Sequence, residues 1–66
     1  MENLAEGLVR ELNRNRELLE DYKEIGPNGA FGAKMIEIDI SAGEKAQGET
    51  DVIAMCQAFN SLKNNK

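Results

Sequence analysis

Few residues in this chain have the type and spacing that catalysis requires. Cys56 is the single cysteine among 66 residues, and the chain contains no histidine that could activate its thiol. It follows the apolar run Val52 to Met55, which predicts a packed, unreactive side chain. Glu37 and Asp39 are two residues apart and would point to different faces of a helix, whereas acid–base catalysis needs groups that converge. The sequence therefore predicts no enzyme activity, no catalytic residue, no metal site and no cofactor.

Three arginines, Arg10, Arg14 and Arg16, lie close together along the chain. Guanidinium groups clustered in this way could hold a phosphate or the carboxylate of a partner. Carboxylates stand three or four residues away along the same segment, at Glu6, Glu17 and Glu20. Pairs at this spacing stabilise a helix by about 0.2–0.5 kcal/mol each, so pairing within one helix is the expected role of the arginines.

The elements that would position these residues are helices. Residues 3–24 contain no proline and are rich in leucine, glutamate and arginine, which favour a helix. Gly26 followed by Pro27 is a typical helix stop and predicts a turn at 26–29. We expect one all-α domain over residues 1–66, either a three-helix bundle or a long helix packed on a helical hairpin.

Two shorter helices are predicted after the turn. The first, at about 30–47, has apolar residues at helical spacing and would end at Gly48. The apolar residues at that spacing are Phe31, Met35, Ile38, Ala42 and Ala46. The second, at about 50–62, would begin with Thr50 as its N-cap and Asp51 in its first turn.

The segment at 36–40 leaves one alternative open. The run Ile36-Glu37-Ile38-Asp39-Ile40 alternates apolar and acidic residues as a strand does, and β-branched residues favour strands. No other segment resembles a strand, and a lone strand would leave a row of backbone groups unpaired. A helix is therefore the prediction, and an intermolecular strand completed by a second copy is the alternative.

The first helix carries a longer apolar stripe than the later helices could cover. The members of the stripe are Leu4, Leu8, Leu12, Asn15, Leu19 and Tyr22. At 1.5 Å per residue this helix is about 33 Å long, against about 20–25 Å for each of the others. Bare apolar faces usually mark binding surfaces, and so short a chain has little core of its own. We therefore predict a homodimer with this stripe at a twofold interface. Asn15 would either fix the register of that seam or lie solvated at its edge.

The turn resembles a known nucleic-acid element. The residues Ile25-Gly26-Pro27-Asn28-Gly29-Ala30 are similar to the hairpin of the helix-hairpin-helix family, which often reads Ile-Gly-Pro-x-x-Ala. The resemblance implies that hairpin amides and a nearby basic residue hold a DNA phosphate. That role would fall to Gly26, Asn28, Gly29 and Lys34. The family's earlier glycine is here Glu24, an acid that would face the phosphate, so nucleic acid is the alternative partner and a plain interhelical turn is the simpler interpretation.

A second resemblance covers residues 8 to 63. The segments Gly29-Ala30-Phe31-Gly32-Ala33, Met35-Ile36, Asp39-Ile40, Glu44-Lys45-Ala46 and the helix from Asp51-Val52 to Leu62-Lys63 are similar to small phage and prophage proteins without an assigned activity. The resemblance carries over no functional residue. It implies a bacterial cytoplasm and an accessory role, such as binding and inhibiting a host or defence protein.

Composition narrows the classes of partner. The net charge of −4 argues against nucleic acid or an anionic membrane as a bulk partner, and no apolar run approaches the 18 or so residues of a membrane span. The sequence thus predicts a small acidic helical protein of the cytoplasm that self-associates and acts by binding a protein. The alternatives are a nucleic-acid module using the hairpin at 26–30, an acidic inhibitor that imitates DNA, and a small-ligand binder with its site in a dimer cleft.

Overall fold

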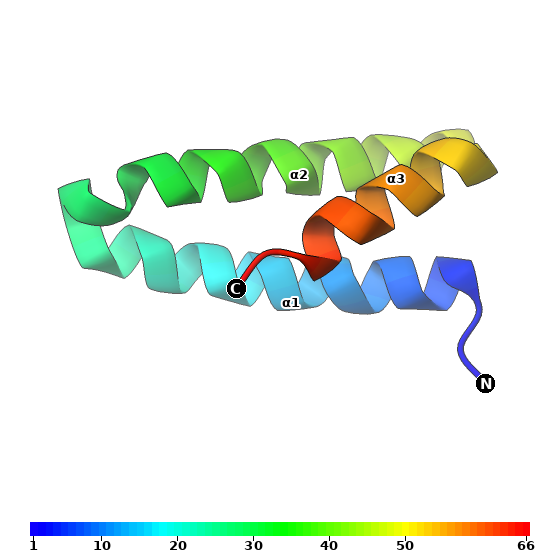
Figure 1. Ribbon diagram of the computed structural model, residues 1–66, viewed down its shortest axis with the longest axis horizontal. Helices are drawn as coiled ribbons and strands as arrows, with labels where there is room; N and C mark the ends of the chain where they lie inside the picture. The colour runs from blue at the N-terminus through cyan, green and yellow to red at the C-terminus, as the bar shows by residue number, and fades with distance from the viewer.

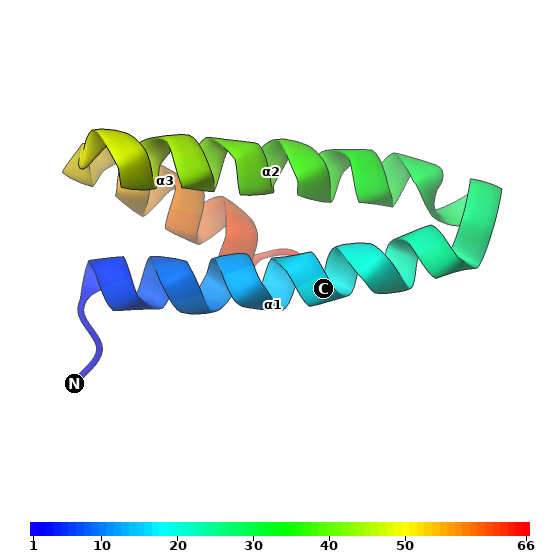
Figure 2. The same cartoon turned by 180° about the vertical axis from the view of Figure 1, so that it is seen from behind.

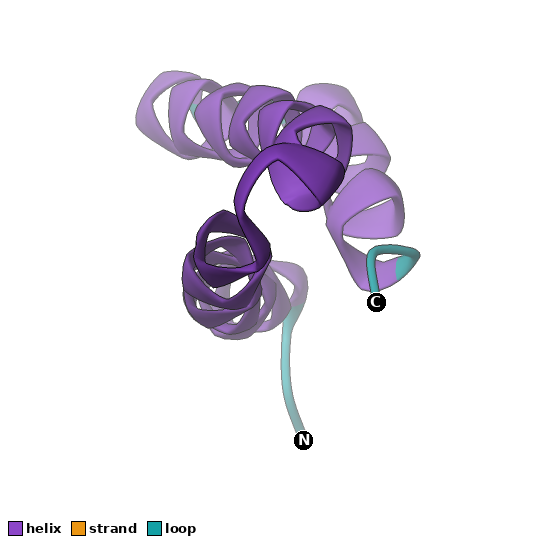
Figure 3. Ribbon diagram, turned by 90° about the vertical axis from the view of Figure 1, so that its left-hand side faces the viewer, coloured by secondary structure: helices purple, strands orange, loops and turns teal.

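The computed structural model describes all 66 residues, which form three α-helices and one short 3₁₀ turn. α1 spans Leu4–Ile25, η1 spans Gly26–Gly29, α2 spans Ala30–Glu49 and α3 spans Val52–Lys63. α1 and α2 run antiparallel, and α3 turns back from the end of α2 to pack against both (Figures 1 and 2). Seen from the end, the three helices enclose one interior (Figure 3). The predicted all-α fold is confirmed, and the segment at 36–40 is helical.

Both ends of α1 are set by capping groups. Asn3 accepts a hydrogen bond from the Glu6 N–H at 2.8 Å, and the Glu6 side chain accepts one from the Asn3 N–H, which together form a capping box. At the other end Gly26 has a φ of 83°, and its N–H donates to the Lys23 carbonyl oxygen. Glycine adopts this backbone conformation without the steric cost of a Cβ, so the predicted stop at Gly26 is confirmed.

The junction between α2 and α3 differs from the prediction by two residues. α2 continues through Gly48 to Glu49, and Thr50 takes a left-handed conformation with a φ of 52°. Asp51, not Thr50, is the N-cap of α3, because its carboxylate accepts from the N–H groups of Ile53 and Ala54 at 3.0 and 3.2 Å. An exposed glycine only weakens a helix, so Gly48 does not end α2.

One face of each helix contributes to the core. Its buried members are Leu8, Leu12, Ile36, Ile40, Ala46, Ala58 and Leu62. Gly43 of α2 lies beneath two of the leucines, since a Cβ there would be 2.8 Å from Leu12 Cδ2 and 3.1 Å from Leu62 Cδ1. The absence of a side chain at Gly43 therefore lets α1 and α3 approach α2 closely.

The apolar stripe that indicated α2 lies outside the core except for its last member, Ala46. The residues that face inward are Ala33, Ile36, Ile40, Gly43 and Ala46. Phe31, Met35, Ile38 and Ala42 are all exposed, on the opposite side of the helix. α2 has two apolar stripes, and the one with small residues packs inside because it allows α1 and α3 to approach.

Gly29 is expected to be intolerant of any side chain. Its Cβ would collide with the carbonyl oxygen of Tyr22 and lie 3.1 Å from Ile25 Cβ. Because backbone cannot move aside easily, Gly29→Ala should lower the free energy of unfolding by about 1–3 kcal/mol. Gly48→Ala is the matched control: nothing lies within 4 Å of a Cβ there, so it should raise stability by about 0.5–1 kcal/mol. Urea unfolding would measure both, and a Gly29→Ala protein as stable as the wild type would contradict this turn geometry.

Candidate functional site

Half of the α1 stripe that was predicted as a dimer seam is buried within the chain. Leu8, Leu12 and Asn15 are 0%, 1% and 0% exposed. The partly buried members are Leu4, Leu19 and Tyr22. α2 has 20 residues against 22 in α1, so it covers more of the stripe than expected, and α3 packs beside it. The prediction that Leu8, Leu12 and Asn15 lie at a seam between copies was wrong, because these residues are buried within one chain. Self-association itself stays a prediction.

Asn15 is neither solvated nor at a seam between copies. Its Nδ2 donates to the carbonyl oxygens of Glu11 at 2.8 Å and Leu62 at 3.1 Å. Its Oδ1 accepts from Asn65 Nδ2 at 2.9 Å, and that same nitrogen donates to Asp39 Oδ2 at 2.9 Å. The buried amide thus has its hydrogen-bonding capacity satisfied. It joins α1 to the end of α3 and to the residues that follow it.

Glu11 is the second polar group of the interior, at 3% exposed. Arg14 Nε donates to Glu11 Oε1 at 2.9 Å, and Arg10 Nη1 pairs with the other carboxylate oxygen. Arg14 Nη2 also donates to the Leu62 carbonyl oxygen at 2.8 Å. A buried carboxylate requires such partners, so Arg10 and Arg14 are engaged within the fold.

The remaining arginine contacts also lie within the chain. Arg16 Nη2 pairs with Glu44 of α2 at 2.9 Å, which joins α1 to α2. Arg10 Nε donates to Glu2 at 2.8 Å, and this hydrogen bond lowers the pKa of the Glu2 carboxyl and raises that of Arg10. Pairing within α1 is confirmed for Arg10 and Arg14, which contact Glu11 and not the predicted Glu6, Glu17 or Glu20. It was wrong for Arg16, which pairs with α2, and Arg10 also pairs outside α1, with Glu2.

The four residues that would hold a DNA phosphate in the alternative function differ in their exposure to solvent. Asn28 and Lys34 are exposed, whereas Gly29 is buried. The N–H of Gly26 donates to the Lys23 carbonyl oxygen and caps α1. A shallow hollow of about 310 Å³ lies beside this turn. Its lining includes Tyr22, Lys23, Gly26, Ala30, Ala33, Lys34 and Glu37. A role in DNA binding stays a prediction.

Cys56 is exposed, so the prediction that it packs in the core was wrong. α3 buries Ala58 and Leu62 and partly buries Ala54 and Met55, and this orientation turns Cys56 outward. No group of three His, Cys, Asp or Glu side chains lies close enough to hold a metal ion. None of the three helices combines the length and apolar character needed to cross a bilayer.

The exposed residues that sequence reasoning missed lie on the outer face of α2, defined here as Phe31, Met35, Ile38 and Ala42. Phe31 is 80% exposed, Ile38 50% and Met35 46%. Large apolar side chains scattered singly are ordinary on a protein surface, but three in a row along one helix form a patch. Their spacing of four and three residues indicated a helix, but it did not indicate which side of that helix is exposed.

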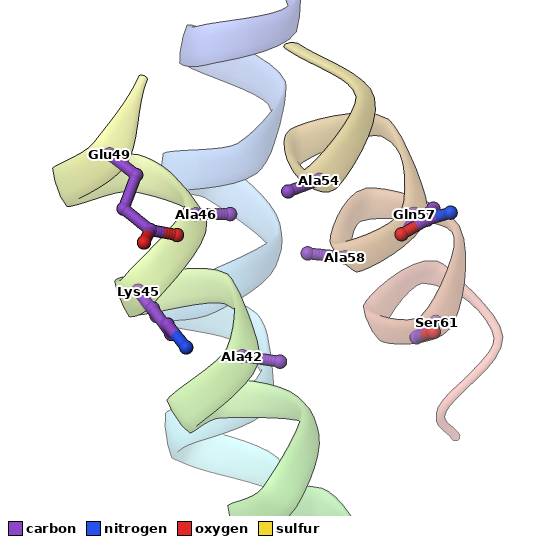
Figure 4. Close-up of a pocket in the computed structure, with 8 residues that line it drawn as sticks. All are labelled: Ala42, Lys45, Ala46, Glu49, Ala54, Gln57, Ala58 and Ser61. Carbon is purple, nitrogen blue, oxygen red and sulfur yellow. The ribbon is translucent and has the colours of Figure 1, made fainter. Parts of the chain in front are cut away.

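A hollow adjoins the same face between α2 and α3. This alanine groove has a volume of about 300 Å³. Its lining residues are Ala42, Lys45, Ala46, Glu49, Ala54, Gln57, Ala58 and Ser61. In Figure 4 the alanines of the two helices point toward one another, and Lys45, Glu49 and Gln57 stand around them. Ala42 belongs both to the groove and to the outer face of α2.

No family model, curated protein or solved structure matches the chain.

Proposed function

We propose that this chain acts by binding another protein through the outer face of α2. The observation that carries the proposal is the exposure of Phe31 beside Met35 and Ile38. Burying apolar surface is favourable by about 25 cal/mol per Å², and aromatic residues and methionine are enriched at protein interfaces. An amphipathic helix with such a face typically docks through anchors at this spacing.

The biological setting of this proposal is an accessory protein of a phage or prophage that binds or inhibits a bacterial host or defence factor. The resemblance of residues 8 to 63 to small phage and prophage proteins supports that setting. The surface supports binding rather than catalysis, because the arginines and the buried Glu11 and Asn15 are occupied by contacts within the chain.

The proposal predicts that Phe31 is required for capture of a partner. Tagged wild-type protein should retain a bacterial protein from a lysate, and Phe31→Glu should reduce the retained amount at least about tenfold, as expected for an aromatic anchor worth 2 kcal/mol or so. Ile53→Glu is the matched control, because Ile53 is 72% exposed but lies on α3 outside this face. Equal capture by all three proteins would contradict the proposal, and so would capture that depends only on Ile53.

A further inference from the structure

We propose that, in the free protein, a second copy of the chain covers the outer face of α2 in an antiparallel twofold dimer. Each Phe31 would lie in the alanine groove of the other copy. The inference rests on the proposed function, because it assigns an occupant to the same face. It adds a form of regulation: a different protein must compete with the second copy for this surface.

The bulky part and the hollow part of this surface lie on one side of α2. At 3.6 residues per turn, Phe31, Met35, Ile38 and Ala42 fall within an arc of about 60° around the helix axis. Two further groove residues, Lys45 and Glu49, continue along the same line. The first half of α2 therefore presents a ridge, and the second half borders a groove.

A twofold axis perpendicular to α2 matches the ridge of one copy to the groove of the other. With the axis between Met35 and Ile38, Met35 lies opposite Ile38 of the second copy. Phe31 then lies opposite Ala42 of the second copy, eleven residues or about 16 Å along the helix. Side chains on a helix lean toward its N-terminus, which carries the Phe31 ring on toward Ala46. Such an interface is self-complementary, as a twofold dimer requires.

The groove is large enough for this ring. Its volume of about 300 Å³ exceeds the 150 Å³ or so of an apolar cavity that accommodates benzene. Its floor of small side chains offers apolar contact to the ring, and the ammonium group of Lys45 at the rim can lie beside it in a cation–π contact. A parallel dimer would instead stack Phe31 on its own symmetry mate and leave both grooves empty.

Charges at the flanks of the face permit the antiparallel arrangement. Lys34 makes no ion pair within the chain, and in this register it is level with Asp39 of the second copy, with Ser41 about 3 Å along the axis, rather than opposite another lysine. Lys45 of the second copy would be about 9 Å further along the axis. At that separation in water, repulsion between the two ammonium groups is largely screened.

The area available indicates a reversible dimer. The parts of the two α2 helices that face each other in this register, residues 31–42, are about 16 Å long, and one helix is about 10–12 Å wide. The contact between the two α2 helices is therefore on the order of 200 Å² per copy in projection, which lies below the total of 1,200 Å² or more that is typical of specific interfaces. We expect a weak dimer that dissociates at about 100 μM or above.

Sedimentation equilibrium over a series from micromolar to millimolar concentration tests the dimer. Wild-type protein and Ile53→Glu should form dimers, and Phe31→Glu and Ala42→Glu should remain monomers at every concentration. Phe31 and Ala42 are exposed, so both variants should keep the helical circular dichroism spectrum of the wild type. A wild type that stays monomeric at the highest concentration overturns the proposal, and so does a dimer that Phe31→Glu leaves intact.

Crosslinking tests the orientation in a Cys56→Ser background, which removes the exposed native thiol. Met35→Cys lies beside the twofold axis and should link two copies through a short bismaleimide. Ala42→Cys should give no link, because its symmetry mate would be about 16 Å away along the axis. Linking through residue 42 but not 35 would overturn the antiparallel arrangement.

The two proposals can fail separately. If the wild type is monomeric but lysate capture still depends on Phe31, the dimer is wrong and protein binding stands with a different partner. If the wild type forms the expected dimer and no other protein is captured, the dimer stands and the accessory role falls.

Discussion

Replacing Leu12 by aspartate should leave no folded protein at any concentration. Leu12 is 1% exposed and lies in the core, with its Cδ2 over Gly43. A domain of 66 residues has a total stability of only about 3–10 kcal/mol. Truncation of a core leucine to alanine already costs about 2–5 kcal/mol, and an unpaired carboxylate in the same place costs more. Far-UV circular dichroism should therefore show the loss of the helical spectrum.

Val9→Asp is the matched control for this experiment. Val9 is 44% exposed and lies three residues earlier on the same helix, so the same charge should leave the protein folded. The result also separates two accounts of α1. A residue at a seam between copies would give a folded monomer on charge insertion, whereas a residue of a single-chain core gives unfolding that does not depend on concentration. A folded Leu12→Asp monomer would contradict the core described above.

Asn15→Asp should remove about 3–5 kcal/mol of stability at neutral pH. The substitution keeps the shape of the side chain but replaces the Nδ2 donor with an oxygen that faces the carbonyl oxygens of Glu11 and Leu62. The Leu62 carbonyl oxygen keeps its hydrogen bond from Arg14, so the cost comes from placing a charge among buried acceptors, which is about 3–5 kcal/mol. Asn13→Asp is the control, because Asn13 is exposed and uses only its Oδ1, which accepts from Arg16.

The same variant should show a distinct pH dependence. Burial among carbonyl oxygens would raise the pKa of the new carboxyl in the folded state above its unfolded value. The folded protein would then bind the proton more tightly than the unfolded chain, so the free energy of unfolding would rise as the pH falls. Asn15→Asp should therefore recover stability relative to wild type on acidification. Thermal unfolding of both proteins between about pH 3 and pH 7 would measure the difference. A constant difference would contradict the buried, carbonyl-facing position of residue 15.

Local signals in the sequence were sufficient to predict the helices. A long helix without proline, followed by Gly26 and Pro27, placed the end of α1 within a residue or so. The sequence does not determine the residue at which α3 begins, because Thr50 and Asp51 are both good caps and only the backbone conformation of Thr50 decides between them. Such ambiguity is inherent in adjacent residues of similar capping strength.

The faces of the helices could not be predicted in the same way. α2 has two apolar stripes, and Gly43 becomes a packing residue only once Leu12 and Leu62 meet above it. Those leucines are 50 residues apart in the sequence. The burial of Asn15 could not be predicted for the same reason, because its partners Leu62 and Asn65 lie at the far end of the chain. The exposure of Phe31, and with it the candidate binding surface, therefore follows only from the packing of the three helices.

A dilution series followed by amide NMR tests most directly the central claim that the chain associates through α2 and not through α1. Concentration-dependent shifts should appear at Phe31, Met35, Ile38 and Ala42, and at the groove residues of α3. The amides of Leu8 and Leu12 should not shift, because these residues are buried within one chain. Shifts confined to α1, or a spectrum in which α2 does not respond to concentration, would contradict the account.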